Sequence, residues 1–146
     1  MFMFTIAHTL ENTICQMYRL MHAYRADVAG MGWRSVSDIY TAVKALPYTR
    51  DHDAPECLGH GECVKRPGIT LATGGDCDDK VIVAGAAMLE LGIPFRVVTT
   101  SYREDGEMQH TYLEVLVEGR WRPFDATYER NQLFVEAPYT AKQVWK

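Results

Sequence analysis

The sequence has no cluster of basic residues, and this absence excludes two classes of partner. Its 15 Lys and Arg residues are outnumbered by 19 Asp and Glu residues, which gives a net charge of −4. Surfaces that bind nucleic acid or anionic membranes need a patch of positive charge. No apolar run approaches the roughly 20 residues that are needed to span a bilayer. We therefore expect neither a nucleic-acid partner nor a membrane partner.

Cysteine is also scarce, with four residues in a chain of 146. Cys15, Cys57, Cys63 and Cys77 are too few for a disulfide scaffold in a chain of this size, which predicts a reducing, cytoplasmic compartment. Cys15 lies in a helical pattern and is predicted to be a small buried residue. The apolar N-terminus, "MFMFTIAHTL", has neither a basic leader nor a small-residue cleavage site. We interpret it as the lead-in to a helix.

What the chain does contain is enough apolar sequence for one core. Its length and its hydrophobic fraction of 47% predict a single domain over residues 1–146. Apolar residues at helical spacing predict helices over Thr9–Val28 and Ser35–Leu46. The segment Tyr48–Gly75 carries five glycines and two prolines and is predicted to be a loop. A loop of this length in a compact domain is usually functional or held in place by other groups.

The stretch "ATGGDCDDKVIVAGAAMLELGIP" begins at Ala72 and predicts a helix that is buried on nearly all sides. Asp76 or Asp78 can cap its start, and Gly92 followed by Pro94 ends it. Three strands are predicted to follow, over Phe95–Tyr102, His110–Val117 and Arg120–Thr127, and the C-terminal "APYTAKQVWK" is interpreted as a peripheral tail. This order predicts an α+β fold, with helices packed on one face of an antiparallel sheet.

Cys77 stands at the start of the buried helix, where the helix dipole and backbone N–H groups favour a thiolate. The same N–H groups can hold an oxyanion when the thiolate attacks a carbonyl. Asp76, Asp78 and Asp79 oppose this effect, because nearby carboxylates raise the pKa of a thiol. A reactive Cys77 therefore requires a cationic partner.

His110 and Asp125 are predicted to meet at the open end of a hairpin. The turn centred at Gly119 places the two residues two to three positions from direct register, so their side chains can meet if they face the same side. If the buried helix packs on that face, Cys77 is brought to His110. The three residues then supply nucleophile, base and orienting acid. The alternative is that the three residues have no catalytic role, with Cys77 a buried thiol, His110 an incidental histidine and Asp125 a turn-forming residue.

The stretches "GGDCDDKVIVAGAAMLELGIPFRVV" and "QHTYLEVLVEGRWRPFDAT" resemble the core of the transglutaminase-like cysteine hydrolase superfamily, over roughly Leu71–Thr127. The resemblance implies a papain-like fold and a catalytic triad of Cys77, His110 and Asp125. It leaves the oxyanion side chain open among Trp33, Tyr48 and Gln109. The "GGDCDDK" variant is also similar to transglutaminase-like proteins encoded in phage and prophage gene clusters. This similarity implies phage-encoded partners and a virion-associated location as alternatives.

A second group of residues, His52, Cys57, His60 and Cys63, lies in the predicted loop. Three interpretations are open: a zinc site, a disulfide between the two cysteines, or separate thiols. The spacing fits no standard zinc module, so we favour the thiols or the disulfide and expect neither a metal nor a cofactor.

The function predicted from the sequence is hydrolysis of amide or peptide bonds in a protein or peptide substrate, through an acyl-enzyme. Two alternatives are open. The same triad serves transglutaminase-type acyl transfer, that is, crosslinking or deamidation. The domain can also be a catalytically silent structural or binding module of a phage particle.

Overall fold

The computed structural model describes residues 4–7, 9–50 and 62–146. Within these ranges the elements follow one another in the order β1 (Phe4–Ala7), α1 (Leu10–Ala23), α2 (Ala26–Ala29), α3 (Val36–Lys44), β2 (Glu62–Lys65), α4 (Pro67–Thr73), α5 (Cys77–Leu91), β3 (Phe95–Ser101), β4 (His110–Val117), β5 (Arg120–Phe124) and β6 (Ala141–Trp145). None of the helices in the described ranges is long and apolar enough to cross a membrane.

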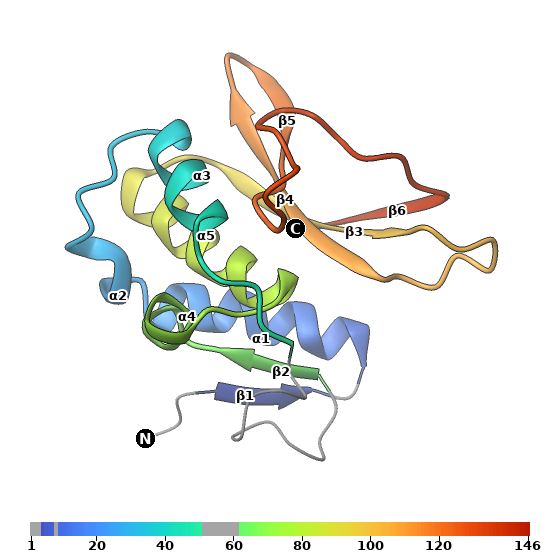
Figure 1. Cartoon of the computed structure of the whole chain (residues 1–146), viewed down its shortest axis with the longest axis horizontal. Helices are drawn as coiled ribbons and strands as arrows, with labels where there is room; N and C mark the ends of the chain where they lie inside the picture. Colours follow the sequence, from blue (N-terminus) through green and yellow to red (C-terminus); the bar gives the residue numbers. More distant parts are fainter. Residues whose placement is uncertain (1–3, 8, 51–61) are drawn as a thin grey trace.

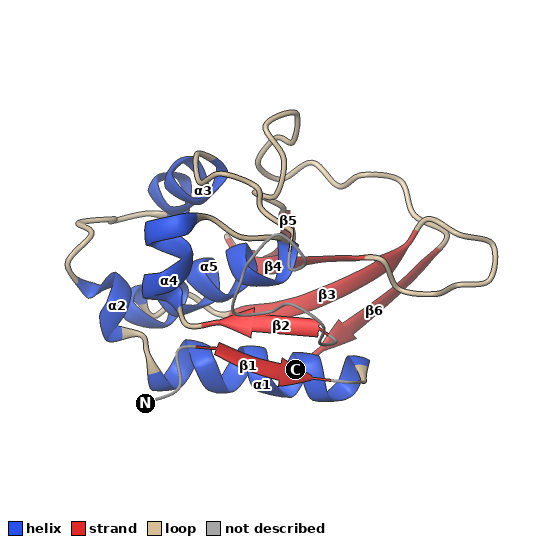
Figure 2. Ribbon diagram, turned by 60° about the horizontal axis from the view of Figure 1, so that its bottom comes forward, coloured by secondary structure: helices blue, strands red, loops and turns tan. Residues whose placement is uncertain are grey.

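The main sheet is antiparallel, with the strand order β5-β4-β3-β6. A separate antiparallel pair, β1 and β2, lies on the far side of the helices from this sheet (Figures 1 and 2). The β4–β5 hairpin turns through Glu118 and Gly119, which have φ angles of 54° and 77°. Positive φ at both central residues is the requirement of a type I′ turn. The arrangement confirms the predicted α+β class.

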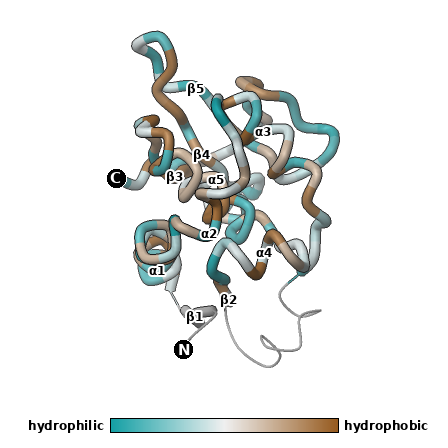
Figure 3. Tube along the Cα trace, turned by 90° about the vertical axis from the view of Figure 1, so that its left-hand side faces the viewer, coloured by the Kyte–Doolittle hydropathy of each residue, from teal (hydrophilic) through white to brown (hydrophobic). Residues whose placement is uncertain are grey.

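Helix α5 forms the centre of the core. Every residue from Asp78 to Met88 is buried, and Figure 3 shows the helix among the other elements instead of at an edge. Helix α1 crosses it closely at Gly85, where a Cβ atom would lie only 2.4 Å from the Sδ atom of Met21. A side chain at position 85 would therefore require the buried Met21 side chain to move. The sheet also contributes to this core, since Leu113 of β4 and Phe124 of β5 belong to the same hydrophobic cluster as the buried residues of α5.

Local signals set the two ends of α5 as the sequence predicts. Asp76 is the N-cap, and Gly92 closes the helix in the left-handed conformation with a φ of 69°. Helix α3 begins after Ser35, the first residue of the predicted range, whose side chain accepts a hydrogen bond from the Asp38 N–H group. The strands β3, β4 and β5 lie within the predicted ranges.

The N-terminal segment leads into a helix, and it contains a strand that the sequence analysis does not predict: residues Phe4–Ala7 form β1, which pairs with β2, before α1 begins at Leu10. Two predictions about the long loop and the C-terminal end are wrong. The predicted loop contains β2 and α4, and α4 begins with Pro67 at its first turn. The C-terminal segment is not a peripheral tail, since β6 pairs with β3. Each of these pairings joins residues that are distant in the sequence.

The first predicted helix is also divided. Helix α1 ends at Ala23, and α2 follows as a separate turn over Ala26–Ala29. The division places Asp27 where its carboxylate accepts hydrogen bonds from Arg66 and from the N–H group of Gly68. Cys15 is exposed on α1, which corrects the prediction that it is buried. Its neighbours Ile14 and Met17 form the buried face of the helix instead.

Candidate active site

Cys77 is the first residue of α5, and its position is fixed by the residues on either side of it. Asp76 and Asp79 form a capping box, in which each side chain accepts a hydrogen bond from the backbone N–H group of the other at 3.2 Å. The chain enters the helix through Gly74, whose φ of 81° and ψ of −176° are accessible essentially to glycine alone. The "GGD" that precedes Cys77 is thus required by the local backbone.

The acids around Cys77 are held by buried partners. Asp79 accepts a hydrogen bond from the Lys65 N–H group at 3.2 Å, and the Lys65 ammonium lies 3.8 Å from its other oxygen. The Cys77 thiol lies 3.8 Å from an Oδ1 atom of Asp78 and donates to it. Lys65 is 1% exposed, so its charge is little screened by solvent. Its ammonium group balances the charge of Asp79, one of the three aspartates next to Cys77 in the sequence.

His110 and Asp125 meet as the hairpin geometry predicts. The Nε2 atom of His110 lies 2.7 Å from the Oδ2 atom of Asp125, and each residue is 5% exposed. The β4–β5 register pairs Leu113 with Phe124, so Asp125 lies two positions from the residue that would face His110 directly. The second Asp125 oxygen accepts a hydrogen bond from the Thr127 N–H group at 3.2 Å. A ring nitrogen bound to a carboxylate in this way is held in one orientation.

Two side chains from the helical layer hold the segment that carries Asp125. The hydroxyl group of Tyr40 on α3 donates to the Asp125 carbonyl at 3.0 Å. The ammonium group of Lys80 on α5 donates to the Thr127 carbonyl at 2.9 Å. Burial and then the Asp125 charge raise the pKa of Tyr40 to about 12, so this hydroxyl group stays protonated at neutral pH. Neither residue is predicted from the sequence, although Lys80 is the one lysine in the apolar helix.

A group of tyrosines connects Cys77 with His110. The His110 ring lies 6.1 Å from the Tyr102 ring and 5.9 Å from the Tyr128 ring, in stacked orientations. Burial first, and then the charges of Asp125 and Cys77 among others, raise the pKa of Tyr102. Tyr128 in turn lies 5.3 Å from the ring of Tyr48. The thiol, the imidazole and the carboxylate therefore have one neighbour in common, Tyr102.

Of the three residues considered for an oxyanion contact, Tyr48 is the one that the structure places at Cys77. Its backbone bridges Gly75, two residues before the cysteine. Burial first, and then the charge of Cys77, raise the pKa of Tyr48, so its hydroxyl group keeps its proton. Trp33 instead packs against the hydrophobic core. The side-chain oxygen of Gln109 accepts a hydrogen bond from the N–H group of Tyr102.

The described residues contain no group of three or more His, Cys, Asp or Glu side chains arranged to hold a metal ion. The second group of residues predicted from the sequence lies outside the described part of the chain: His52, Cys57 and His60 entirely, and Cys63 with its side chain.

A model of the family described as the "Transglutaminase-like superfamily" matches residues 33–126. This match covers more than half of the chain and includes Cys77, His110 and Asp125. The chain belongs to the transglutaminase-like superfamily. The matched range begins well before the stretches that carry the resemblance in the sequence, so the superfamily core also includes α3 and α4.

One solved structure similar to this superfamily member is that of a "Putative Cysteine Protease from Cytophaga hutchinsonii". The two chains are 18% identical, with a TM-score of 0.47. The similarity covers 90% of this chain and 51% of the other, so this chain spans about half the length of that protein. No curated protein sequence matches the chain.

Proposed function

We propose that the protein is a thiol-dependent hydrolase of amide or peptide bonds, in which Cys77, His110 and Asp125 act as a catalytic triad. The observation that carries the proposal is the buried 2.7 Å contact between His110 and Asp125. A histidine oriented by a buried carboxylate is the arrangement that accepts and returns a proton efficiently. Membership of the transglutaminase-like superfamily supports the assignment of Cys77 as the nucleophile.

In the proposed reaction the Nδ1 atom of His110 takes the proton of the Cys77 thiol, and the thiolate attacks the carbonyl carbon of the substrate amide. A carbon–sulfur bond forms while the carbonyl π electrons move to oxygen. The Nε2 atom of His110 is hydrogen-bonded to Asp125. The Nδ1 atom is therefore the one that gives its proton to the leaving nitrogen as the carbon–nitrogen bond breaks. Water then attacks the thioester and gives a proton to Nδ1, and the Cys77 thiolate leaves. The products are an amine and a carboxylic acid.

The first test compares Cys77→Ala, His110→Ala and Asp125→Ala with the wild type on a library of fluorogenic peptides. We expect no turnover for Cys77→Ala. For the other two variants we expect kcat/KM to fall about 10²- to 10⁴-fold, the usual contribution of general acid–base catalysis. Cys15→Ala is the matched control, because it removes an exposed thiol that lies on α1. Turnover by Cys77→Ala on any substrate of the wild type would contradict the proposal.

A second measurement separates the enzyme from a silent module and hydrolysis from acyl transfer. An activated Cys77 should react with iodoacetamide well below about pH 8, and faster than Cys15. Equally slow labelling of the two thiols would favour the silent module. Mass spectrometry of the products formed with an added primary amine then identifies the acceptor, since water yields an acid and the amine yields a new amide.

A further inference from the structure

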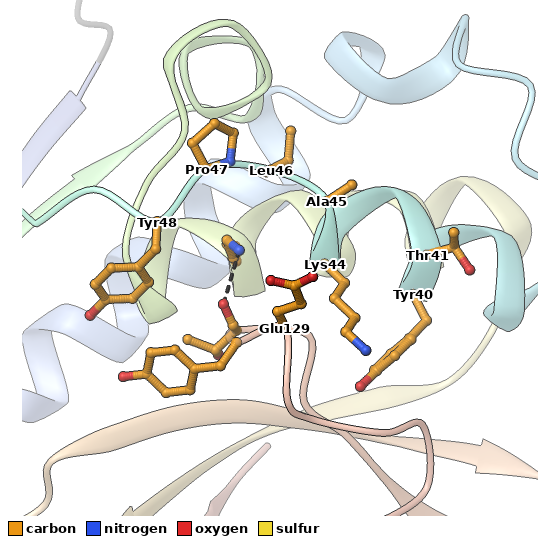
Figure 4. A pocket seen from close by; sticks show the side chains of 11 residues that line it. Tyr40, Thr41, Lys44, Ala45, Leu46, Pro47, Tyr48 and Glu129 are labelled. Carbon is orange, nitrogen blue, oxygen red and sulfur yellow. Dashed lines mark hydrogen bonds between the residues drawn. The ribbon is translucent and has the colours of Figure 1, made fainter.

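A cavity of about 690 Å³ adjoins the Cys77–His110 site. It lies between the end of α3, the Pro47–Tyr48 segment and the residues that follow Asp125 (Figure 4). Two of its lining residues, Tyr48 and Tyr128, are the tyrosines that connect it to the catalytic residues. Its volume is within the range of sites that bind small molecules or peptide side chains.

The cavity contains a buried lysine that forms no ion pair with a carboxylate of the described residues. Lys80 is 3% exposed, and the hydrogen bond of its ammonium group, drawn as the dashed line in Figure 4, goes to the Thr127 carbonyl. No carboxylate in the described part of the chain lies within 4.0 Å of this group, whereas the equally buried Lys65 has Asp79 as its partner. The charge of Asp125 acts on the Lys80 ammonium group without forming an ion pair with it. Buried charges are normally paired. An ammonium group that lines a cavity can obtain its partner from a ligand.

The rest of the cavity is suited to a short acidic group. Lys44 adds a second positive charge, and its ammonium group donates to the Asn131 carbonyl. Leu46 and Pro47 supply an apolar wall for a hydrocarbon stem. Glu129 also lines the cavity but is exposed, so solvent screens its negative charge.

We infer that this cavity binds a carboxylate-bearing group of the substrate, with Lys80 as the residue that recognises it. The inference rests on the proposed function, because the substrate is the amide or peptide that the proposed hydrolase cleaves. Lys80 follows Cys77 by three residues on the same helix, so a group bound there lies one turn from the nucleophile. The carboxylate can belong to an acidic side chain near the cleaved bond or to the C-terminus of a peptide.

Binding is tested without turnover in isotope-labelled Cys77→Ala protein, by NMR titration with three small probes. N-acetyl-glutamate amide carries only a side-chain carboxylate, N-acetyl-glutamine carries only an α-carboxylate, and N-acetyl-glutamine amide carries neither. We expect one of the charged probes to shift the backbone signals of Lys80, Thr127 and Tyr128, and the neutral probe to leave them unchanged. The charged probe that binds identifies the source of the carboxylate. Equal shifts with all three probes, or none with any, would overturn the inference.

Specificity is tested by the ratio of kcat/KM for a peptide that carries the carboxylate identified by the probes to that for its neutral analogue. The pair is Glu against Gln for a side-chain carboxylate, and a free C-terminus against a C-terminal amide for an α-carboxylate. Lys80→Gln keeps a donor for the Thr127 carbonyl but removes the charge, so the ratio should fall about ten- to hundredfold. Glu129→Gln removes the competing carboxylate, so the ratio should rise. Lys146→Gln makes the same chemical change as the first variant at an exposed site and should leave the ratio unaltered.

The outcomes separate this inference from the function on which it rests. Wild-type protein that cleaves peptides with a ratio near one contradicts the carboxylate site and leaves the hydrolase proposal intact. Protein that binds a charged probe but cleaves no peptide contradicts the hydrolase proposal alone. If Lys80→Gln fails to fold, the probe comparison and Glu129→Gln still decide the question, because neither depends on that variant.

Discussion

Individual residues around Cys77 have structural tasks that the chemistry depends on. Asp79 caps the helix, accepts a backbone N–H group from β2 and lies against the Lys65 ammonium. Gly75 has no side chain because a Cβ atom there would lie 2.4 Å from the Cβ atom of Asp79. The acidic cluster in the sequence is therefore largely a device that anchors the start of α5. Its charge is partly balanced by a cation that the sequence analysis did not identify.

At the residue scale, we predict that Tyr48→Phe lowers kcat by about 10²- to 10³-fold, the cost of losing one oxyanion donor. The stability of the protein should change little, since Tyr48 is 41% exposed. Steady-state kinetics on a cleaved peptide and a thermal melt measure the two effects. Tyr139→Phe, at another exposed tyrosine, is the control and should retain kcat. An unchanged kcat in Tyr48→Phe would remove this residue from the proposed mechanism.

Among the elements, the contact between α2 and α4 sets the path into the active site. Arg66, the N-cap of α4, donates to both oxygens of Asp27 at 2.9 and 2.6 Å and packs over the Tyr24 ring at 4.1 Å. Helix α4 then leads through Gly74 to Cys77. A contact near the end of α1 thus helps to place the nucleophile, although it lies outside the site.

At the element scale, we predict that Asp27→Asn lowers the free energy of unfolding by about 1–3 kcal/mol at neutral pH, because charged hydrogen bonds are lost. The Arg66 hydrogen bond holds the pKa of Asp27 below its ordinary value of 3.8. The stabilisation of the folded protein by the ionised Asp27 is therefore complete above its ordinary pKa. It is lost as the pH falls through the lower pKa that Asp27 has in the folded state. Urea unfolding at several pH values should show a weaker acid dependence in the variant.

Asp105→Asn is the control for this experiment, since Asp105 pairs with Arg103 on an exposed hairpin and both side chains are about half exposed. Exposed ion pairs add little to stability. An equal loss in the two variants would mean that Asp27 has no special role. A variant whose acid dependence matches that of the wild type would contradict the assigned pKa shift.

At the scale of the whole molecule, the C-terminal strand joins the sheet to the helical layer. The Tyr18 hydroxyl group on α1 donates to the Trp145 carbonyl at 2.9 Å and accepts from the Val97 N–H group of β3 at 2.9 Å. The indole N–H group of Trp145 donates to the Thr99 hydroxyl group at 2.9 Å. One tyrosine of α1 thus connects the first long helix to two neighbouring strands, β3 and β6.

We therefore predict that Trp145→Ala lowers the free energy of unfolding by about 2 kcal/mol, less than the 3–5 kcal/mol of a fully buried tryptophan. For a domain of this size, that corresponds to a fall in Tm of about 4–8 °C. Thermal unfolding followed by circular dichroism measures the change. Val135→Ala, which truncates an exposed residue, should leave Tm nearly unchanged. A Tm equal to that of the wild type would show that β6 lies outside the cooperative unit.

The similarity of "GGDCDDK" to phage-encoded proteins, and with it a virion location and phage-encoded partners, stays a prediction. So does the single-domain boundary at residues 1–146. Isolation of the protein with its bound partners from the source cells, or from particles, would test the location.

By itself, the sequence determined the features that depend on neighbouring residues. Asp76 and Gly92 fix the ends of α5 because capping acts within one helical turn. The short turn at Gly119 fixes how far His110 and Asp125 lie from register, because each residue in a hairpin advances the strand by a constant rise.

Only the tertiary structure decided the features that join distant segments. The pairing of β1 with β2, the position of β6 and the buried sites of Lys65 and Lys80 each depend on which surfaces remain available after the core has formed. Many alternative long-range pairings are compatible with the same local pattern, and burial of apolar surface selects among them. For this reason the cavity beside the nucleophile could not be predicted from the sequence, whereas the histidine–aspartate pair could.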